Sequence, residues 1–255
     1  MKAVYAGGIG LWTAGYPCPE AWIAREADPA ATAPASALLP AALKRRSSLL
    51  TRMAIETFAQ AAASGGADLA TVPTVWGSAY GEIDTTIAML EMMREPDGLP
   101  SPTRFHNSVH NTAAGTASIA GKNRAMSTSL AAGRETVAMG LLETLALLGE
   151  RGGDAVLVFF DEPPPAPFAP VPAWPALAVA FHLSAERRPT SRIALAELRR
   201  GSAAALPMAG PYAFHPCAPA LGLLEAVVKQ EQQSVPLGHR ADGGWVVEAR
   251  PVPES

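Results

Sequence analysis

The chain has 255 residues, of which 49% are hydrophobic and 17% are charged, and its formal net charge is −3. This length suffices for one large domain or two small ones, with ample apolar material for a core. The slightly negative charge argues against nucleic acid as the main ligand, because nucleic-acid binding needs a basic face.

The chain predicts alternating strands and helices. Apolar residues at mostly helical spacing predict a helix from Ser47, with Ser47 or Ser48 as its N-cap. The predicted strands are residues 3–10, ending in a glycine turn, 69–82, ending in Gly77 and Gly81, 155–160, 176–183, 192–198 and 244–250. The predicted helices are residues 47–63, 83–95, 134–150 and 218–233.

Three stretches predict irregular structure. Residues 29–40 are rich in Ala and Pro, and residues 101–121 read as a polar loop that leads into small residues. Seven prolines between Pro163 and Pro175 exclude regular structure there. The strand at 155–160 is continuously apolar, which is typical of a sheet covered on both faces. Together these elements predict a layered α/β protein.

The segment "MSTSLAAGRETVAMG" at residues 126–140 has the form of a catalytic elbow. A strand of small residues ends in a tight turn, and an apolar helix follows. Elbows of this kind present a nucleophile at a helix N-terminus, where a cysteine thiolate forms readily. The turn itself contains no cysteine, and the nearby Ser127 and Ser129 do not lie in a Gly-x-Ser-x-Gly hydrolase motif.

Residues 101–140 resemble the N-terminal half of β-ketoacyl synthases, the condensing enzymes of the thiolase-like fold. The resemblance is carried by a Ser-Pro start, an Asn followed shortly by Ala-Gly, the elbow, and a glycine on the following helix. Counting back from that glycine places the family's active cysteine at Ala132, whose methyl group cannot accept an acyl chain. These features are Ser101-Pro102, Asn111, Ala114-Gly115 and Gly140.

The resemblance implies a thiolase-like fold (layered αβαβα) with a truncated C-terminal half. We expect a single domain over 1–255, with an N-terminal half at 1–160, a Pro-rich connection at 161–175 and a reduced C-terminal half at 176–255. No match to the family's first histidine motif is found. Setting Leu221-Gly222 on the second motif places Pro219 at the histidine position, with His215 four residues upstream.

A short synthase without a nucleophile resembles the chain-length-factor subunit that pairs with an active ketosynthase, in particular the form found in aryl-polyene pathways. The resemblance implies such a ketosynthase as partner, contact with an acyl carrier protein through the complex, and no catalytic residue of its own. It implies no cofactor. The expected tunnel and interface residues are Phe105, His106, Asn107, His110, Asn111, Met126 and Ala132.

Other interpretations stay open at this point. The chain could be a reduced acyltransferase or hydrolase that uses Ser129 or Cys217, with His215 beside Cys217 as a possible base. It could also be a self-pairing structural relative. His106 and His110 have a metal-ligand spacing, but no nearby carboxylate or cysteine completes a site and the segment is not expected to be helical, so we expect no metal.

The two cysteines, Cys18 and Cys217, cannot form a disulfide framework, which fits a reducing compartment. No uncharged apolar stretch reaches the ~20 residues of a membrane span. We therefore expect a cytoplasmic protein that contacts neither membrane nor nucleic acid. Because a truncated C-terminal half leaves apolar sheet faces uncovered, we also expect poor solubility without a partner.

Overall fold

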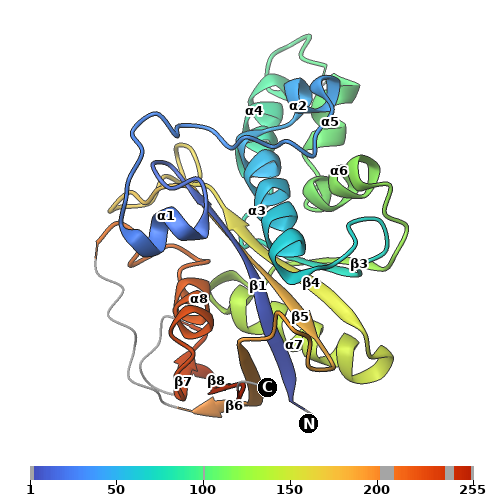
Figure 1. Cartoon of the computed structure of the whole chain (residues 1–255). Helices are drawn as coiled ribbons and strands as arrows, with labels where there is room; N and C mark the ends of the chain where they lie inside the picture. The colour runs from blue at the N-terminus through green and yellow to red at the C-terminus, as the bar shows by residue number, and fades with distance from the viewer. Residues whose placement is uncertain (1–2, 100, 202–209, 239–243, 254–255) are drawn as a thin grey trace.

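A computed structural model describes residues 3–99, 101–201, 210–238 and 244–253. The described strands form one eight-stranded sheet in the order β3-β2-β4-β5-β1-β6-β8-β7 (Figure 1). The strands are β1 (Val4–Thr13), β2 (Thr74–Gly77), β3 (Ser127–Leu130), β4 (Asp154–Asp161), β5 (Leu177–Ser184), β6 (Ile193–Gly201), β7 (Gln233–Pro236) and β8 (Gly244–Pro251). The helices are α1 (Pro19–Ala24), α2 (Ala41–Arg46), α3 (Leu49–Gly65), α4 (Ile83–Met93), α5 (Pro102–Asn107), α6 (Thr112–Gly121), α7 (Thr136–Arg151) and α8 (Pro219–Lys229), with a 3-10 turn, η1 (Gly133–Glu135), before α7.

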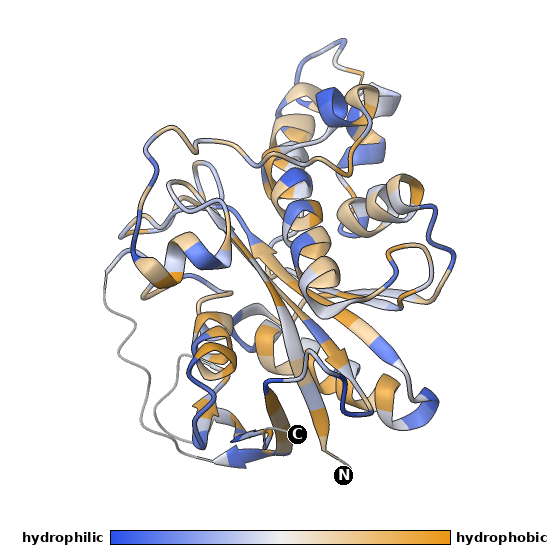
Figure 2. Cartoon of the chain, in the orientation of Figure 1, coloured by the Kyte–Doolittle hydropathy of each residue, from blue (hydrophilic) through white to orange (hydrophobic). Residues whose placement is uncertain are grey.

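Helices cover both faces of the sheet. Alternate residues of β4 point to opposite sides: Leu157 and Phe159 join the core beneath α7 and α8, and Val158 and Phe160 join the core beneath α3 and α6. Much of β4 and β5 is accordingly hydrophobic in Figure 2, while polar colour gathers on the outer helices and loops. The continuous apolar run expected for a doubly covered strand is confirmed, because both of its side-chain rows are buried.

The glycines of β1 allow helix α3 to pack closely against the strand. A Cβ on Gly8 would lie 2.3 Å from the carbonyl oxygen of Ala61, and a Cβ on Gly10 would lie 2.2 Å from that of Thr57. The helix backbone therefore rests directly on the strand, where no side chain fits. The glycine turn expected at the end of residues 3–10 is wrong, since β1 continues through these glycines to Thr13.

Helix α3 begins and ends as its sequence predicts. The Ser48 hydroxyl accepts a hydrogen bond from the Thr51 N–H at 2.9 Å, which identifies Ser48 as the N-cap. Gly66 follows the helix at φ 76°, the left-handed conformation that glycine adopts without strain. Burial of ten residues of this helix, from Leu50 to Gly65, anchors it across the sheet.

The polar loop expected at residues 101–121 is instead two helices, α5 and α6. Ser101 caps α5 by accepting from the Arg104 N–H, and Pro102 occupies the first turn, where its missing N–H costs nothing. The Ser101-Pro102 pair was therefore a sequence signal for the start of a helix, but the small and polar residues that follow it show no apolar periodicity. Helices α1 and α2 and strand β7 were also missed, and α8 ends at Lys229, earlier than expected.

The Pro-rich stretch before β5 contains no helix or strand, as expected. Trp174 anchors its end: the indole is buried, packs edge-on against the His215 ring at 4.4 Å and stacks on Tyr80 at 6.3 Å between ring centroids. Among the described helices, none has the length and apolarity needed to cross a membrane.

Candidate functional site

Strands β2, β3 and β4 are parallel, so their carboxyl ends lie along the same end of the sheet, here called its carboxyl edge. Strand β2 pairs in parallel with β3 on one side and with β4 on the other. Their carboxyl ends therefore bring together the loop from Ser78 to Glu82, the elbow around Ala132, and Asp161 with Glu162. The loop and the elbow are joined by a backbone hydrogen bond of 3.2 Å from Ser78 N–H to Leu130 O.

The elbow consists of the end of β3, a short turn and the start of α7, and its turn contains no cysteine or serine. Ala132 adopts φ −143° and ψ 27°, and Gly133 follows at φ 55° with open space where a side chain would stand. The Ala132 N–H donates to the Thr136 hydroxyl at 3.1 Å, and that hydroxyl donates to Gly133 O at 2.8 Å. Ala132 is only half-buried, so the turn is accessible while its side chain is a methyl group.

Behind this edge, Asp161 is fully buried and accepts four hydrogen bonds. Its carboxylate receives the Ser78 hydroxyl at 2.8 Å, the N–H groups of Ala79 and Tyr80 at 2.9 and 3.0 Å, and the Cys217 thiol at 3.1 Å. Burial raises the pKa of Asp161, and the four donors oppose that rise. This carboxylate joins the loop after β2 to the segment that precedes α8. We call Asp161, Ser78, Cys217 and His215 the Asp161 cluster.

The Cys217 thiol in this cluster is held in its protonated form. Burial raises its pKa well above the usual range, and the neighbouring Asp161 charge and hydrogen bond raise it further. His215 is not placed as its base: Nδ1 accepts the Cys217 backbone N–H at 3.0 Å, so the ring proton lies on Nε2, which faces Asp161 O at 3.2 Å. The geometry does not favour a Cys–His nucleophile pair.

Glu162 lies next to the cluster among other acids. Burial and, to a lesser extent, the charges of Glu82, Asp84 and Asp161 together raise its pKa to about 7. The Glu82 carboxylate accepts hydrogen bonds from three hydroxyl groups, those of Ser48, Thr51 and Thr85, while burial raises its pKa. In the part of the chain that the structure describes, no group of three His, Cys, Asp or Glu side chains could hold a metal ion.

The α5 segment lies at the surface near the same loop. The Phe105 side chain is 61% exposed, and His106 is also exposed. Asn107 donates to Arg46 O at 2.8 Å, while the His110 Nε2 lies 3.0 Å from Ser78 O. Because one histidine contacts the loop and the other faces outward, their i, i+4 spacing does not form a ligand pair.

Residues 20–245 match the family described as Beta-ketoacyl synthase, N-terminal domain. The chain belongs to this β-ketoacyl synthase family. No curated protein sequence matches it. The family and fold expected from residues 101–140 are therefore confirmed.

Solved structures of ketosynthase complexes share this fold. A chain of the ketosynthase ApeO in complex with its chain length factor ApeC, from Xenorhabdus doucetiae, superposes with a TM-score of 0.69 at 21% identity, over 97% of this chain and 99% of that chain. The ishigamide ketosynthase/chain length factor gives 0.63 at 16% identity, over 78% and 67%. A type II polyketide synthase complex of ketosynthase and acyl carrier protein, AntDE:AntF, gives 0.61 at 12% identity, over 79% and 69%. The fold is thus α/β and thiolase-like, with a truncated C-terminal half.

The family glycine on α7 has a packing role in this chain. A Cβ on Gly140 would lie 2.5 Å from the Phe159 ring, and one on Gly77 would lie 2.8 Å from the same ring. Helix α7 can therefore approach β4 closely, which keeps the elbow at the sheet edge. Met126, an expected tunnel residue, is half-buried and packs against the core on the α7 face, and its carbonyl accepts the Thr74 N–H at 3.0 Å.

The expected site residues fall into two groups in space. Ala132 lies at the elbow and His110 touches the loop after β2, so both adjoin the carboxyl edge of the sheet. Phe105, His106, Asn107 and the exposed Asn111 lie on or just after α5, at the surface. Pro219 begins α8, and His215 is buried in the Asp161 cluster.

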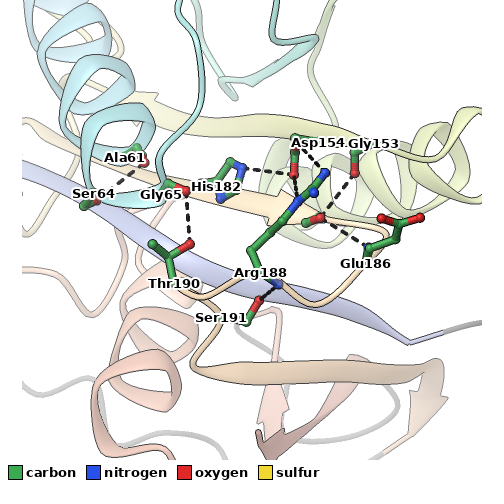
Figure 3. A network of polar contacts seen from close by, with 11 residues as sticks. Ala61, Ser64, Gly65, Gly153, Asp154, His182, Glu186, Arg188, Thr190 and Ser191 are labelled. Carbon is green, nitrogen blue, oxygen red and sulfur yellow. Dashed lines mark hydrogen bonds and ion pairs between the residues drawn. The ribbon is translucent and has the colours of Figure 1, made fainter. Parts of the chain in front are cut away.

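Asp161, Ser78 and Glu162 were not predicted as site residues. The available signal was the Asp161-Glu162 pair directly after a buried apolar strand. A second polar network, at the opposite end of β4 and drawn in Figure 3, was not predicted either. There the Arg188 guanidinium binds both oxygens of Asp154, at 3.2 and 3.0 Å, and His182 Nε2 lies 3.4 Å from the same carboxylate. These contacts join β4, β5 and the turn before β6, and burial lowers the pKa of His182.

Proposed function

We propose that the chain is a non-catalytic, chain-length-factor-type subunit that pairs with an active β-ketoacyl synthase. The complex would serve aryl-polyene, polyketide or fatty-acid-like biosynthesis and would meet its acyl carrier protein through the ketosynthase. The whole of 1–255 would act as one ketosynthase-like domain, with halves at 1–160 and 176–255 joined by the connection at 161–175.

The observation that carries this proposal is the elbow. It retains the turn, the following helix and the close packing of Gly140, yet it presents Ala132 where thioester exchange requires a thiolate. Of the two cysteines, Cys18 precedes α1, and Cys217 is buried, protonated and bonded to Asp161. A subunit that keeps the shape and lacks the reactive group suits a role in forming the partner's tunnel.

Pairing is supported by surface features on the β3 side of the molecule. Strand β3 is the outermost strand on its side of the sheet, so its outer backbone groups can pair with a strand of another subunit. Exposed apolar side chains lie on α4, α5, α6 and the turn between the last two, and such side chains suit a protein interface. They are Leu90, Met93, Phe105, Val109 and Ile119.

The first test is an affinity purification of the tagged full chain from its native cells, with bound proteins identified by mass spectrometry. We expect a full-length ketosynthase at a one-to-one ratio, because the elbow of this chain cannot itself carry an acyl group. Recovery of the chain alone, or only as a homodimer that ignores every ketosynthase offered, would overturn the pairing.

A second test addresses chemistry in the isolated chain. After exposure to acyl carrier protein loaded with an acyl group, we expect the intact mass to be unchanged. A stable adduct would contradict the non-catalytic assignment and would support the alternative of a reduced acyltransferase or hydrolase. Ser129→Ala and Cys217→Ala variants would then locate the adduct.

A further inference from the structure

A cavity of about 420 Å³ lies between α1 and α8, away from the elbow. Its apolar lining comes from Tyr16, Trp22, Ile23, Leu224 and Val228, and its charged lining from Arg25, Glu225 and Lys229. Cavities of roughly 300–1,000 Å³ with mostly apolar walls and a few polar groups are the usual form of small-molecule sites.

The side chains of the apolar wall are held in place by contacts within the protein. The Trp22 indole makes edge-to-face contacts with Tyr16 at 5.1 Å and with Tyr212 at 5.3 Å between ring centroids. The Tyr212 hydroxyl lies 3.0 Å from that of Thr13 on β1, which fixes the aromatic stack to the sheet. Leu224, only 1% exposed, belongs to the main core. Binding here would therefore require little reordering of side chains.

One of the two cationic side chains that line the cavity has no ion-pair partner among the residues that the structure describes. Lys229 and Glu225 form an i, i+4 ion pair of 3.3 Å on α8. Arg25 makes no ion pair with any residue that the structure describes, although it lines the cavity. The lining as a whole carries two cations and one anion, so an anionic group at the rim would meet Arg25.

Arg25 also occupies a backbone position that favours glycine. It is the C-cap of α1 at φ 58° and ψ 31°, with its N–H directed to Ala21 O and Trp22 O. A left-handed C-cap is usually glycine, because a Cβ there lies too close to the following carbonyl oxygen. A long cationic side chain at this strained position, directed at a cavity, is consistent with use of that side chain.

We propose that this cavity binds an amphiphilic carboxylate, with its apolar chain against Trp22, Ile23 and Val228 and its carboxylate on Arg25. The aromatic and aliphatic wall suits a hydrocarbon chain, and the guanidinium suits a carboxylate. The site is independent of the proposed pairing, since it lies on the α1 and α8 side and not at β3.

The test uses the purified full chain and isothermal titration calorimetry with decanoate, with decanol as the uncharged probe of similar chain length. We expect saturable binding of decanoate near one molecule per chain, and about tenfold weaker binding of decanol. Equal affinity for the two probes, or no saturable binding of decanoate below its micellar concentration, would overturn the proposal.

Two glycine variants separate binding from backbone strain. Arg25→Gly relieves the left-handed strain and removes the cation, so we expect unchanged or slightly raised thermal stability and about tenfold weaker decanoate binding. Lys122→Gly is the matched control, since Lys122 is the C-cap of α6 at φ 53° and ψ 30°, and it should not alter decanoate affinity. If both variants bind decanoate like the parent chain, the carboxylate site is wrong.

A third variant tests the apolar half of the site. Val228→Trp places a large ring in the cavity from α8, so binding of decanoate and decanol should both be lost while the fold, judged by circular dichroism, is kept. Undiminished binding by a folded Val228→Trp protein would show that the probes bind elsewhere and would overturn the proposal.

Discussion

The elbow and the Asp161 cluster lie at the same edge of the sheet and differ in a revealing way. The elbow is open to solvent but presents only the Ala132 methyl group. The cluster contains a thiol, an imidazole and a carboxylate, but all three are buried: the thiol donates to the carboxylate, and the imidazole bonds to the backbone of Asp161 and Cys217. One region has access without reactive chemistry, and the other has reactive residue types without access.

This difference shows that the presence of reactive residue types does not by itself make a reactive site. Cys217 and His215 are two residues apart and contact the same aspartate, which on sequence grounds resembles nucleophilic machinery. In the structure, the thiol donates to a carboxylate, which opposes thiolate formation, and the imidazole Nδ1 accepts from the backbone. The cluster instead ties the loop after β2 to the start of α8, joining the two halves of the chain.

The largest expected effect comes from breaking the cluster. Asp161→Ala leaves the Ser78 hydroxyl, two backbone N–H groups and the Cys217 thiol without their acceptor in a buried site. We expect a loss of about 3–5 kcal/mol in the free energy of unfolding, measured by urea denaturation. The control is Asp68→Ala, which removes an exposed aspartate that also accepts from backbone and hydroxyl groups. Equal losses in the two variants would contradict the structural role of the cluster.

A smaller effect should come from Glu162, which lies beside the cluster. Its pKa is raised from 4.5 to about 7, so the folded chain binds more protons than the unfolded chain between these pH values. Stability contributed by protonated Glu162 is therefore complete below about pH 4.5 and is lost as the pH rises through about 7. We expect Glu162→Gln to be more stable than the parent chain at pH 8, by at most about 3 kcal/mol, and to show no gain at pH 4.5.

The measurement is urea denaturation of both proteins across this pH range. The exposed Glu150, on α7, supplies the control, and Glu150→Gln should follow the parent chain at every pH. A Glu162→Gln gain that does not vary with pH would mean that the charge of Glu162 is not its cause.

The smallest effect on stability is expected at the elbow, where a new thiol allows the accessibility of the elbow to be compared directly with that of the Asp161 cluster. In a Cys18→Ser background, Ala132→Cys should change the free energy of unfolding by no more than about 0.5 kcal/mol, because Ala132 is only half-buried and the substitution adds a single heavy atom. The new thiol should react quickly with a thiol reagent, while Cys217 should react only after unfolding. Rapid labelling of Cys217 in the folded Cys18→Ser parent would contradict the burial of the cluster.

Much of the fold could be predicted from local patterns. The helical spacing from Leu49 and the serine cap before it each act within a few residues, so the helix predicted over 47–63 is observed at Leu49–Gly65. The two-sided apolar run of β4 predicted a doubly covered sheet. Helices α5 and α6 were missed because their small and polar residues carry little apolar periodicity, and packing against α4 and α3 stabilises them instead.

By itself, the sequence determined the family, the elbow and the absence of a thiol at Ala132, because these depend on the order and spacing of a few residues along the chain. Only the tertiary structure decided that Cys217, His215 and Asp161 form a closed buried cluster, that Gly8 and Gly10 admit a helix, and that α1 and α8 enclose a cavity. Asp161 precedes His215 by 54 residues and Cys217 by 56, and the partners in the other two cases are likewise tens of residues or more apart. Burial, pKa and hydrogen-bond partners depend on what the fold brings into contact, and no local pattern encodes those contacts.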